Sequence, residues 1–262
     1  MTFDYERPVR IKRHPIRNTI IVLVIIGALG TSGYLVADSL ARSFATTFVQ
    51  TGVAQQLGVP TDQVHVDLGK GSVLLQVVQK HIKRLHVTVD AFTSGTLAGS
   101  AVLDAVQVPL NTKDPASSID ITVSVAASGL LGLVESTSGQ SQATVSITGG
   151  DIRVSTNEKV LGATVPVSID FAPSGSGVTL VLTPKNIVVG SKSYTPASLK
   201  ASKYGRFVSG LMATRHECLA GGLPRGMQLG SIAVTGGRLV IEARGANLPL
   251  SSLSSKGICP AS

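Results

Sequence analysis

The sequence predicts an α+β, β-rich protein preceded by one transmembrane helix. Three observations lead to this fold class: residues 18–37 carry no charge, residues 38–58 have apolar side chains at helical spacing, and apolar and polar residues alternate from Val64 nearly to the end. Alternation with a period of two is typical of antiparallel strands with one dry face and one wet face. The expected organisation is a basic cytoplasmic tail (1–17), a transmembrane signal anchor (18–37) and an exported β-rich domain (38–262).

The uncharged segment 18–37 (NTIIVLVIIGALGTSGYLVA) is long enough for one membrane crossing. A helix of about 20 residues at a rise of ~1.5 Å covers the ~30 Å hydrocarbon layer. A cleaved secretory signal is the alternative, but its apolar core is usually only about 7–15 residues long. The positive-inside rule puts the amino terminus in the cytoplasm and the rest outside the plasma membrane, in the periplasm or cell envelope. The cationic residues that precede the segment are Arg7, Arg10, Lys12, Arg13 and Arg17.

Residues 38–58 predict an amphipathic helix that continues outward from the anchor. Leu40, Phe44 and Phe48 recur at i, i+4 spacing, and Gly58 and Pro60 supply a helix stop. This apolar stripe either packs under a sheet as ordinary core or contacts a ligand.

Short strand-like runs fill most of the remaining sequence. They include VHVDL, LLQVV, LHVTVD, IDITVSVA, ATVSIT, DIRVST, ATVPVSIDFA, VTLVLT and RLVIEAR. Hairpin turns are expected at 173–178 (PSGSGV) and 235–238 (TGGR), and a β-bulge where the apolar register shifts across Gly230. Two helical interruptions are predicted, at 128–135 and 198–221.

The charge balance and composition exclude some classes of partner. The formal net charge is +8, and the chain has four Tyr, six Phe and no Trp. Nucleic-acid binding is not expected, because it needs clustered cations with stacking aromatic rings. A mild positive balance suits an anionic lipid surface. The densest basic group after the anchor contains Lys80, Lys83 and Arg84, which either receive a lipid headgroup or form a solvated strand face.

The cysteines Cys218 and Cys259 are expected to form one disulfide, because an oxidising compartment favours pairing of two otherwise unmatched thiols. A metal site that includes His216 is the alternative. We expect no metal, because the other histidines lie far upstream.

Catalytic signatures are missing from the sequence. It has no GxSxG elbow, P-loop or HExxH motif, and no GxGxxG that follows a strand. Its acidic residues have no spacing that marks a general acid–base pair. The sequence therefore predicts a protein that is not an enzyme and needs no cofactor.

The segment 222–245 (GLPRGMQLGSIAVTGGRLVIEARG) resembles the ending of the LmeA-type family of actinobacterial phospholipid-binding cell-envelope proteins. Leu223, Pro224 and Gly226 match its Leu-Pro-x-Gly turn, which leads into two final strands. The resemblance implies a tubular lipid-binding-like fold, in which a strongly curved antiparallel sheet wraps a long amphipathic helix around an apolar groove. The long anchor and the cysteine pair depart from that pattern.

The resulting hypothesis is a membrane-anchored, extracytoplasmic phospholipid-binding protein that holds or presents lipid in an apolar groove for cell-envelope maintenance. Its expected partners are an anionic phospholipid and the plasma membrane. One alternative is a non-enzymatic structural or interaction domain that docks an envelope protein partner, and another is an enzyme acting on envelope lipid or glycan. Residues predicted for the groove, each of which alternatively forms ordinary core, are Phe44, Phe48, Leu130, Leu131, Leu133, Leu211 and Met212.

Overall fold

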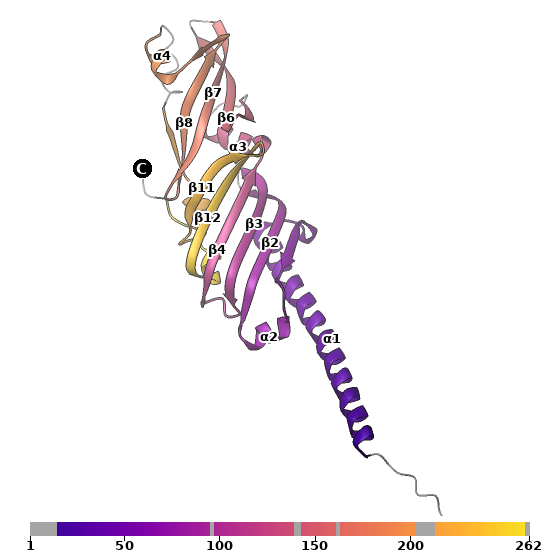
Figure 1. Ribbon diagram of the computed structural model, residues 1–262. Helices are drawn as coiled ribbons and strands as arrows, with labels where there is room; N and C mark the ends of the chain where they lie inside the picture. The colour runs from indigo at the N-terminus through magenta and orange to yellow at the C-terminus, as the bar shows by residue number, and fades with distance from the viewer. Residues whose placement is uncertain (1–14, 95–96, 139–142, 161–162, 203–212, 260–262) are drawn as a thin grey trace, which may run out of the picture.

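The computed structural model describes residues 15–94, 97–138, 143–160, 163–202 and 213–259. Its strands form two six-stranded antiparallel sheets, which lie end to end in an elongated molecule (Figure 1). Sheet A has the strand order β1-β2-β3-β4-β12-β11, and sheet B has the order β10-β8-β7-β6-β5, with β9 paired to β8.

Sheet A is built from both ends of the folded chain. Its strands are β1 (Val64–Asp67), β2 (His81–Ser94), β3 (Leu97–Pro109), β4 (Pro115–Val125), β11 (Gln228–Thr235) and β12 (Arg238–Pro249).

Sheet B lies between them in the sequence. Its strands are β5 (Thr144–Thr148), β6 (Asp151–Val160), β7 (Ala163–Ser176), β8 (Thr179–Val189), β9 (Lys192–Tyr194) and β10 (Arg215–Cys218). The helices are α1 (Pro15–Leu57), α2 (Val73–Val78), α3 (Ala127–Ser138) and α4 (Pro196–Lys200), with 3-10 turns η1 (Thr61–Gln63), η3 (Ala220–Gly222) and η4 (Leu250–Ser254).

The predicted single curved sheet is wrong, because the strands divide into two sheets. After β4 the chain crosses into sheet B and then returns, so that β12 pairs with β4, with Leu239 opposite Val125. Strongly twisted sheets rarely exceed about ten strands without splitting, which accounts for the division.

The predicted long amphipathic helix wrapped by a sheet is also wrong. Helix α1 is 43 residues long, and its described side chains are apolar on two sides. Small residues such as Ala45 and Val49 pack on sheet A, whereas Phe44 and Phe48 are 75% and 73% exposed. Small side chains allow close approach to the sheet on one side of the helix only. The carboxyl-terminal part of α1 therefore lies against the edge strand β1 of sheet A, and its amino-terminal part extends away from both sheets (Figure 1).

The predicted single-pass membrane topology is contradicted as well. Within the described ranges, no helix has both the length and the apolar character needed to cross a membrane.

Several local predictions are confirmed. The hairpin turns form at Gly177, between β7 and β8, and at Gly236 and Gly237, between β11 and β12, and all three glycines have positive φ angles. The register of β11 against β12 shifts between Leu229 and Ser231, where the bulge is expected. Helix α1 ends at Leu57 with Gly58 in the left-handed region, and the helix predicted at 128–135 lies within α3.

Two local predictions are wrong for tertiary reasons. The run LLQVV lies in helix α2, because Ser72 caps it and accepts a hydrogen bond from the Leu75 N–H. The predicted helix 198–221 overlaps the end of α4 only at residues 198–200, and Arg215–Cys218 form strand β10, which pairs with β8. Residues 203–212, between them, lie outside the described ranges.

The apolar interior runs along the molecule as three clusters. The first lies under sheet A and includes Ala54 of α1. The second joins the two sheets, where Leu180 of sheet B packs with Ile232 and Leu239 of sheet A. The third lies under sheet B and is covered by Leu199 of α4.

Candidate functional site

The inner face of sheet A, which faces the apolar clusters, contains an incompletely buried strip. In the β3–β4 pairing Ala101 lies opposite Val123 and Leu103 lies opposite Ile121. All four side chains remain partly exposed, although they lie in the interior of the sheet. We call these four residues the central strip.

Fully buried residues border the central strip on the same face. Ala105 and Ile119 are 0% exposed at one end, and Val125 is 0% exposed at the other. On the flanking strands, Val87 lies opposite Leu103 and Ala243 lies opposite Ile121, and both are buried. Buried residues therefore border the strip on β2, β4 and β12, whereas the partial exposure continues along β3 to Gly99.

The two ends of this face are covered by different helices. Helix α1 packs on the first cluster through Ala41, Ala45 and Val49. Helix α3 packs on the other end so closely that a Cβ at Gly129 would lie 1.9 Å from the Ala98 carbonyl oxygen. The partly exposed strip lies on the strands β3 and β4, which connect these ends.

The opposite face of the same strands is polar. Asp104 lies opposite Asp120, Val102 opposite Thr122, and His86 Nδ1 lies 2.9 Å from an Asp104 carboxylate oxygen. The inner strip contributes only hydrocarbon, so its chemistry is apolar contact. Covering such a surface is worth roughly 25 cal/mol per Å², which favours an acyl chain without requiring a reactive group.

The residues predicted for the groove are distributed over separate parts of the fold. Phe44 and Phe48 are exposed on α1, while Leu130 is buried in the second cluster and Leu131 is partly buried beside it. Leu211 and Met212 lie outside the described residues, as does the side chain of Leu133. The structure does not bring Phe44 and Phe48 together with Leu130.

Sequence reasoning missed the central strip. The alternation in IDITVSV correctly separates Ile121 and Val123 from the polar face. The alternation does not show which apolar residues on that face are buried, because their burial depends on packing of the helices α1 and α3 against the sheet.

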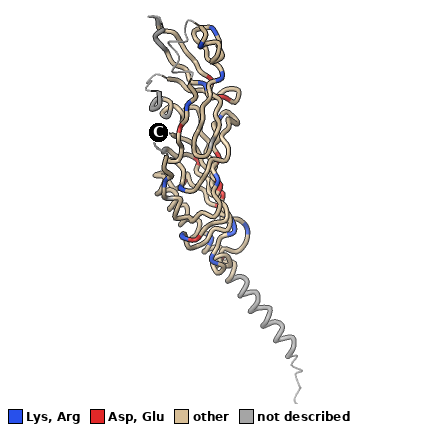
Figure 2. Tube along the Cα trace, turned by 90° about the vertical axis from the view of Figure 1, so that its left-hand side faces the viewer, with Lys and Arg blue, Asp and Glu red and all other residues tan. Residues whose placement is uncertain are grey.

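The predicted basic cluster lies directly after α2 and at the start of β2, and Figure 2 shows Lys and Arg residues near the end of the molecule from which α1 departs. Lys80, Lys83 and Arg84 are all exposed there, and the Lys80 carbonyl accepts a 3.0 Å hydrogen bond from the Leu110 N–H. Arg84 lies opposite Val106, whereas the central strip begins further along β3 at Leu103. The cluster is therefore a separate feature from the strip.

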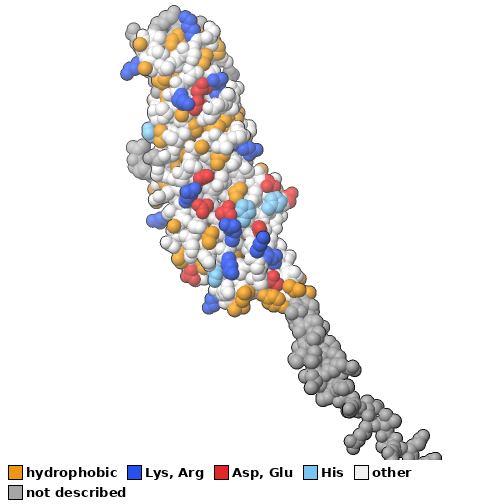
Figure 3. Space-filling model, in the orientation of Figure 1, with side chains coloured by type: hydrophobic (Ala, Val, Ile, Leu, Met, Phe, Trp, Pro, Cys, Tyr) orange, Lys and Arg blue, Asp and Glu red, His pale blue; other side chains and the backbone are white. Residues whose placement is uncertain are grey.

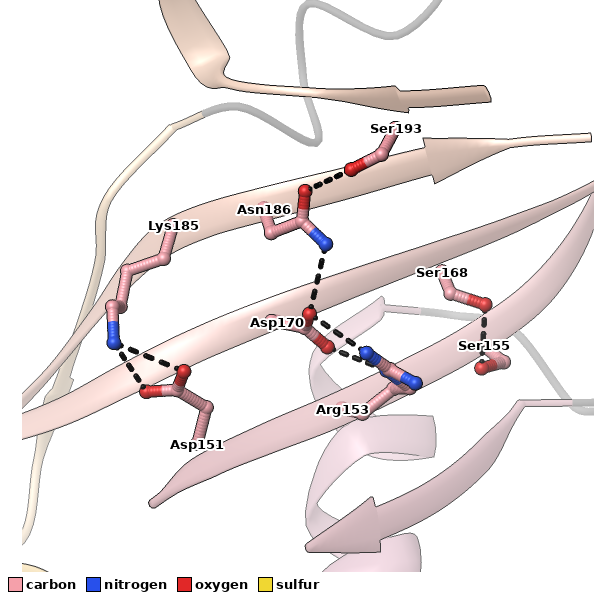
Figure 4. Close-up of polar contacts among 8 residues, drawn as sticks. All are labelled: Asp151, Arg153, Ser155, Ser168, Asp170, Lys185, Asn186 and Ser193. Atoms are coloured by element: carbon pink, nitrogen blue, oxygen red, sulfur yellow. Dashed lines mark hydrogen bonds and ion pairs between the residues drawn. The ribbon is translucent and has the colours of Figure 1, made fainter. Parts of the chain in front are cut away.

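A charged network connects three strands on the outer face of sheet B (Figure 4). Arg153 of β6 donates two hydrogen bonds to Asp170 of β7, at 2.6 and 2.9 Å, and Asn186 of β8 donates one at 3.1 Å. The Arg153 guanidinium, together with Asn186, lowers the pKa of the Asp170 carboxyl below its usual value. Lys185 of β8 pairs with Asp151 of β6 at 3.0 Å as a separate contact near this network. These pairs hold β6, β7 and β8 in register, which is a structural role.

The carboxyl-terminal region contains the expected disulfide, Cys218–Cys259, with the two Cα atoms 5.9 Å apart. Because Cys218 is in the disulfide, it is not a free thiolate, and the alternative metal site with His216 lacks this ligand. The Leu-Pro-x-Gly turn lies against the chain just before Cys259. The Leu223 carbonyl accepts a hydrogen bond from the Gly257 N–H at 3.0 Å, and Pro224 forms an isolated antiparallel β-bridge with Lys256.

Comparison with known proteins identifies one family. The model of the LmeA-like phospholipid-binding family matches residues 36–244, which include the central strip, sheet B and all of sheet A except the end of β12. No curated protein and no solved structure matches the chain. Because the family model spans most of the sequence, the chain belongs to the LmeA-like phospholipid-binding family.

Proposed function

We propose that this protein is a non-enzymatic phospholipid carrier of the cell envelope, which holds or presents an anionic phospholipid with its acyl chain on the central strip. The observation that carries this proposal is the partial exposure of Ala101, Leu103, Ile121 and Val123, which have buried neighbours on β2, β4 and β12.

The physical argument rests on the energy of apolar burial. An acyl chain gains about 0.8 kcal/mol for each methylene that it buries, so a strip of hydrocarbon side chains retains lipid without a catalytic group. The membership in a phospholipid-binding family supports the same ligand class.

A docking module for an envelope protein is the second candidate function. The exposed side chains of Phe44 and Phe48 favour it, because adjacent exposed aromatic residues are common at protein interfaces. The two functions predict different ligands, so one measurement separates them.

Native mass spectrometry of the purified full-length chain tests the carrier. We expect a co-purifying phospholipid on the wild type and its loss in the Ala101→Leu variant, which enlarges a side chain on the strip. Val102→Leu is the matched control, since Val102 is adjacent in sequence but lies on the opposite, polar face. A ligand-free wild type contradicts the carrier, and equal lipid retention in both variants contradicts the assignment to the strip.

Circular dichroism and chemical denaturation of both variants control for damage to the fold. A Leu103→Ser variant adds an independent test, because it removes apolar surface instead of filling space. Loss of lipid in Ala101→Leu and Leu103→Ser, with the sheet signal retained, supports binding at the strip.

A further inference from the structure

Helix α2 buries its polar residue and exposes half of its six residues as apolar side chains. Val73 at its start is buried, but its one polar residue, Gln76, is also only 3% exposed, whereas Leu75, Val77 and Val78 are exposed, Val78 by 77%. A surface helix in water normally buries its apolar side chains and exposes its polar ones. This inversion indicates that the exposed side of α2 meets a non-aqueous partner.

Contacts with α1 and β2 hold α2 in this orientation. Asp38 of α1 accepts hydrogen bonds from the Leu74 N–H at 2.9 Å and from the Ser72 hydroxyl at 2.7 Å, and both lower the pKa of its carboxyl. Arg42 of α1 donates to the carbonyls of Gly69 and Gly71. Rotation of α2 to bury its apolar residues would break these bonds.

A fourth exposed apolar residue extends the same surface. Leu110, in the turn after β3, donates its N–H to the Lys80 carbonyl at 3.0 Å, and the Lys80 N–H bonds to the Val77 carbonyl. Leu110 is therefore next to the end of α2. We define the apolar tip as Leu75, Val77, Val78 and Leu110.

Cationic side chains lie directly beside the apolar tip. Lys80 follows α2 in the sequence, and the Lys83 N–H is bonded to Gln76 at 2.9 Å, which places Lys83 and its neighbour Arg84 next to the helix. Figure 3 shows hydrophobic side chains gathered at this end of the molecule, with Lys and Arg next to them. An apolar surface bordered by cations complements a membrane with an apolar interior and anionic headgroups.

We propose that the apolar tip inserts into the interfacial layer of an anionic phospholipid bilayer, while Lys80, Lys83 and Arg84 contact the headgroups. The inference rests on the proposed function, since a phospholipid carrier must reach a lipid surface to load or deliver its ligand. It assigns the docking surface to one end of sheet A, separate from the central strip.

A single introduced tryptophan tests the insertion, because the chain has no Trp and its emission would report one position only. In the full-length Val78→Trp variant, we expect a blue shift of the emission on adding phosphatidylglycerol vesicles. Ile258→Trp is the matched control, since Ile258 is 83% exposed but lies beside the disulfide. An unshifted emission of the Val78→Trp variant overturns the proposal, and so does a shift that depends on protein concentration without lipid, which would indicate contact between copies.

Charge and apolar variants separate the two parts of the surface. Lys80→Gln and Lys83→Gln should each weaken binding to phosphatidylglycerol vesicles about fivefold and leave binding to phosphatidylcholine vesicles unchanged. Lys200→Gln, on α4 at the other end of the molecule, is the control and should change neither (Figure 1). Equal weakening by all three variants would overturn the assignment of the surface.

A Leu75→Ser/Val78→Ser variant distinguishes docking from lipid retention. We expect at least a tenfold loss of vesicle binding on both lipids, with the co-purified phospholipid still present in the native mass spectrum. Vesicle docking by a ligand-free wild type would instead contradict the carrier function and leave the docking surface supported. Unchanged vesicle binding in the double variant would overturn the docking surface alone.

Discussion

The backbone N–H of Lys83 donates a 2.9 Å hydrogen bond to the side-chain oxygen of Gln76, and this bond ties helix α2 to strand β2. The Gln76 Nε2 is buried and has no hydrogen-bond partner among the described residues. A buried polar residue with one satisfied atom and one unsatisfied atom contributes little net stability, but its loss leaves the Lys83 N–H without a partner.

Two substitutions at Gln76 should therefore differ in their effect on folding. Gln76→Ala removes the bond and opens a cavity, and we expect the free energy of unfolding to fall by about 2–3 kcal/mol. Gln76→Met also removes the bond, but it fills the space and removes the unpaired amide, so it should cost less than Gln76→Ala. Urea denaturation measures the free energy of unfolding of both variants. Equal decreases would contradict a contribution of side-chain packing at Gln76.

The Arg153–Asp170 pair should give stability that depends on pH. The pKa of Asp170 in the folded protein is lowered, first by Arg153 and also by Asn186. Because the folded pKa lies below the unfolded value near 4, the ionised carboxylate stabilises the fold above about pH 4, and this contribution is lost as pH falls through the folded pKa.

Asp170→Asn should consequently lower the free energy of unfolding by about 1–3 kcal/mol at pH 7. The difference from wild type should shrink as the pH falls below about 4, where the wild-type carboxyl also becomes protonated. Asp62→Asn, which changes an exposed carboxylate on η1, is the control. A difference that stays constant from pH 7 to pH 2 would contradict the assignment.

Gly226 in the Leu-Pro-x-Gly turn should not tolerate a side chain. Its φ is +90°, and a Cβ there would lie 2.7 Å from Leu248 Cδ2. We expect Gly226→Ala to lower the free energy of unfolding by about 1–3 kcal/mol. Gly221→Ala is the matched control, because its φ is not positive and the added Cβ would meet nothing within 4 Å. Similar melting temperatures for the two variants would show that the turn adapts.

The Cys218–Cys259 disulfide should stabilise the fold mainly by restricting the unfolded chain. The two residues are 41 positions apart, and a loop of that length corresponds to about 4 kcal/mol on the loop-entropy model. Denaturation of the Cys218→Ser/Cys259→Ser variant measures this, with reduced wild type as the parallel sample. Unchanged stability would show that the backbone bonds of Leu223 and Arg225 to the tail are sufficient alone.

The aromatic residues of α1 should be dispensable for folding. Because Phe44 and Phe48 are mostly exposed, Phe44→Ser/Phe48→Ser should change the free energy of unfolding by no more than about 0.5 kcal/mol per site. Leu130→Ser, in the buried second cluster, should cost at least about 2 kcal/mol. If Phe44 and Phe48 contact lipid, the double variant also loses its bound phospholipid in native mass spectra while its circular dichroism is retained.

The sequence alone determined the features that depend on neighbouring residues. Period-two alternation located most strands, including Ile119–Val125, and glycine pairs located the hairpin at Gly236 and Gly237. The disulfide followed from the presence of only two cysteines. These features are local or have no competing partner, so pattern and composition are sufficient for them.

The tertiary structure alone decided which apolar surfaces are covered. Leu130 and Phe44 are both apolar residues on helices, yet one is buried at the junction of the sheets and the other faces outward. The run LLQVV has strand-like composition, but capping by Ser72 and Asp38 makes it a helix with Gln76 inside. Burial depends on contacts between segments far apart in the chain, such as β4 with β12, and for that reason alternation within one segment could not predict the central strip or the apolar tip.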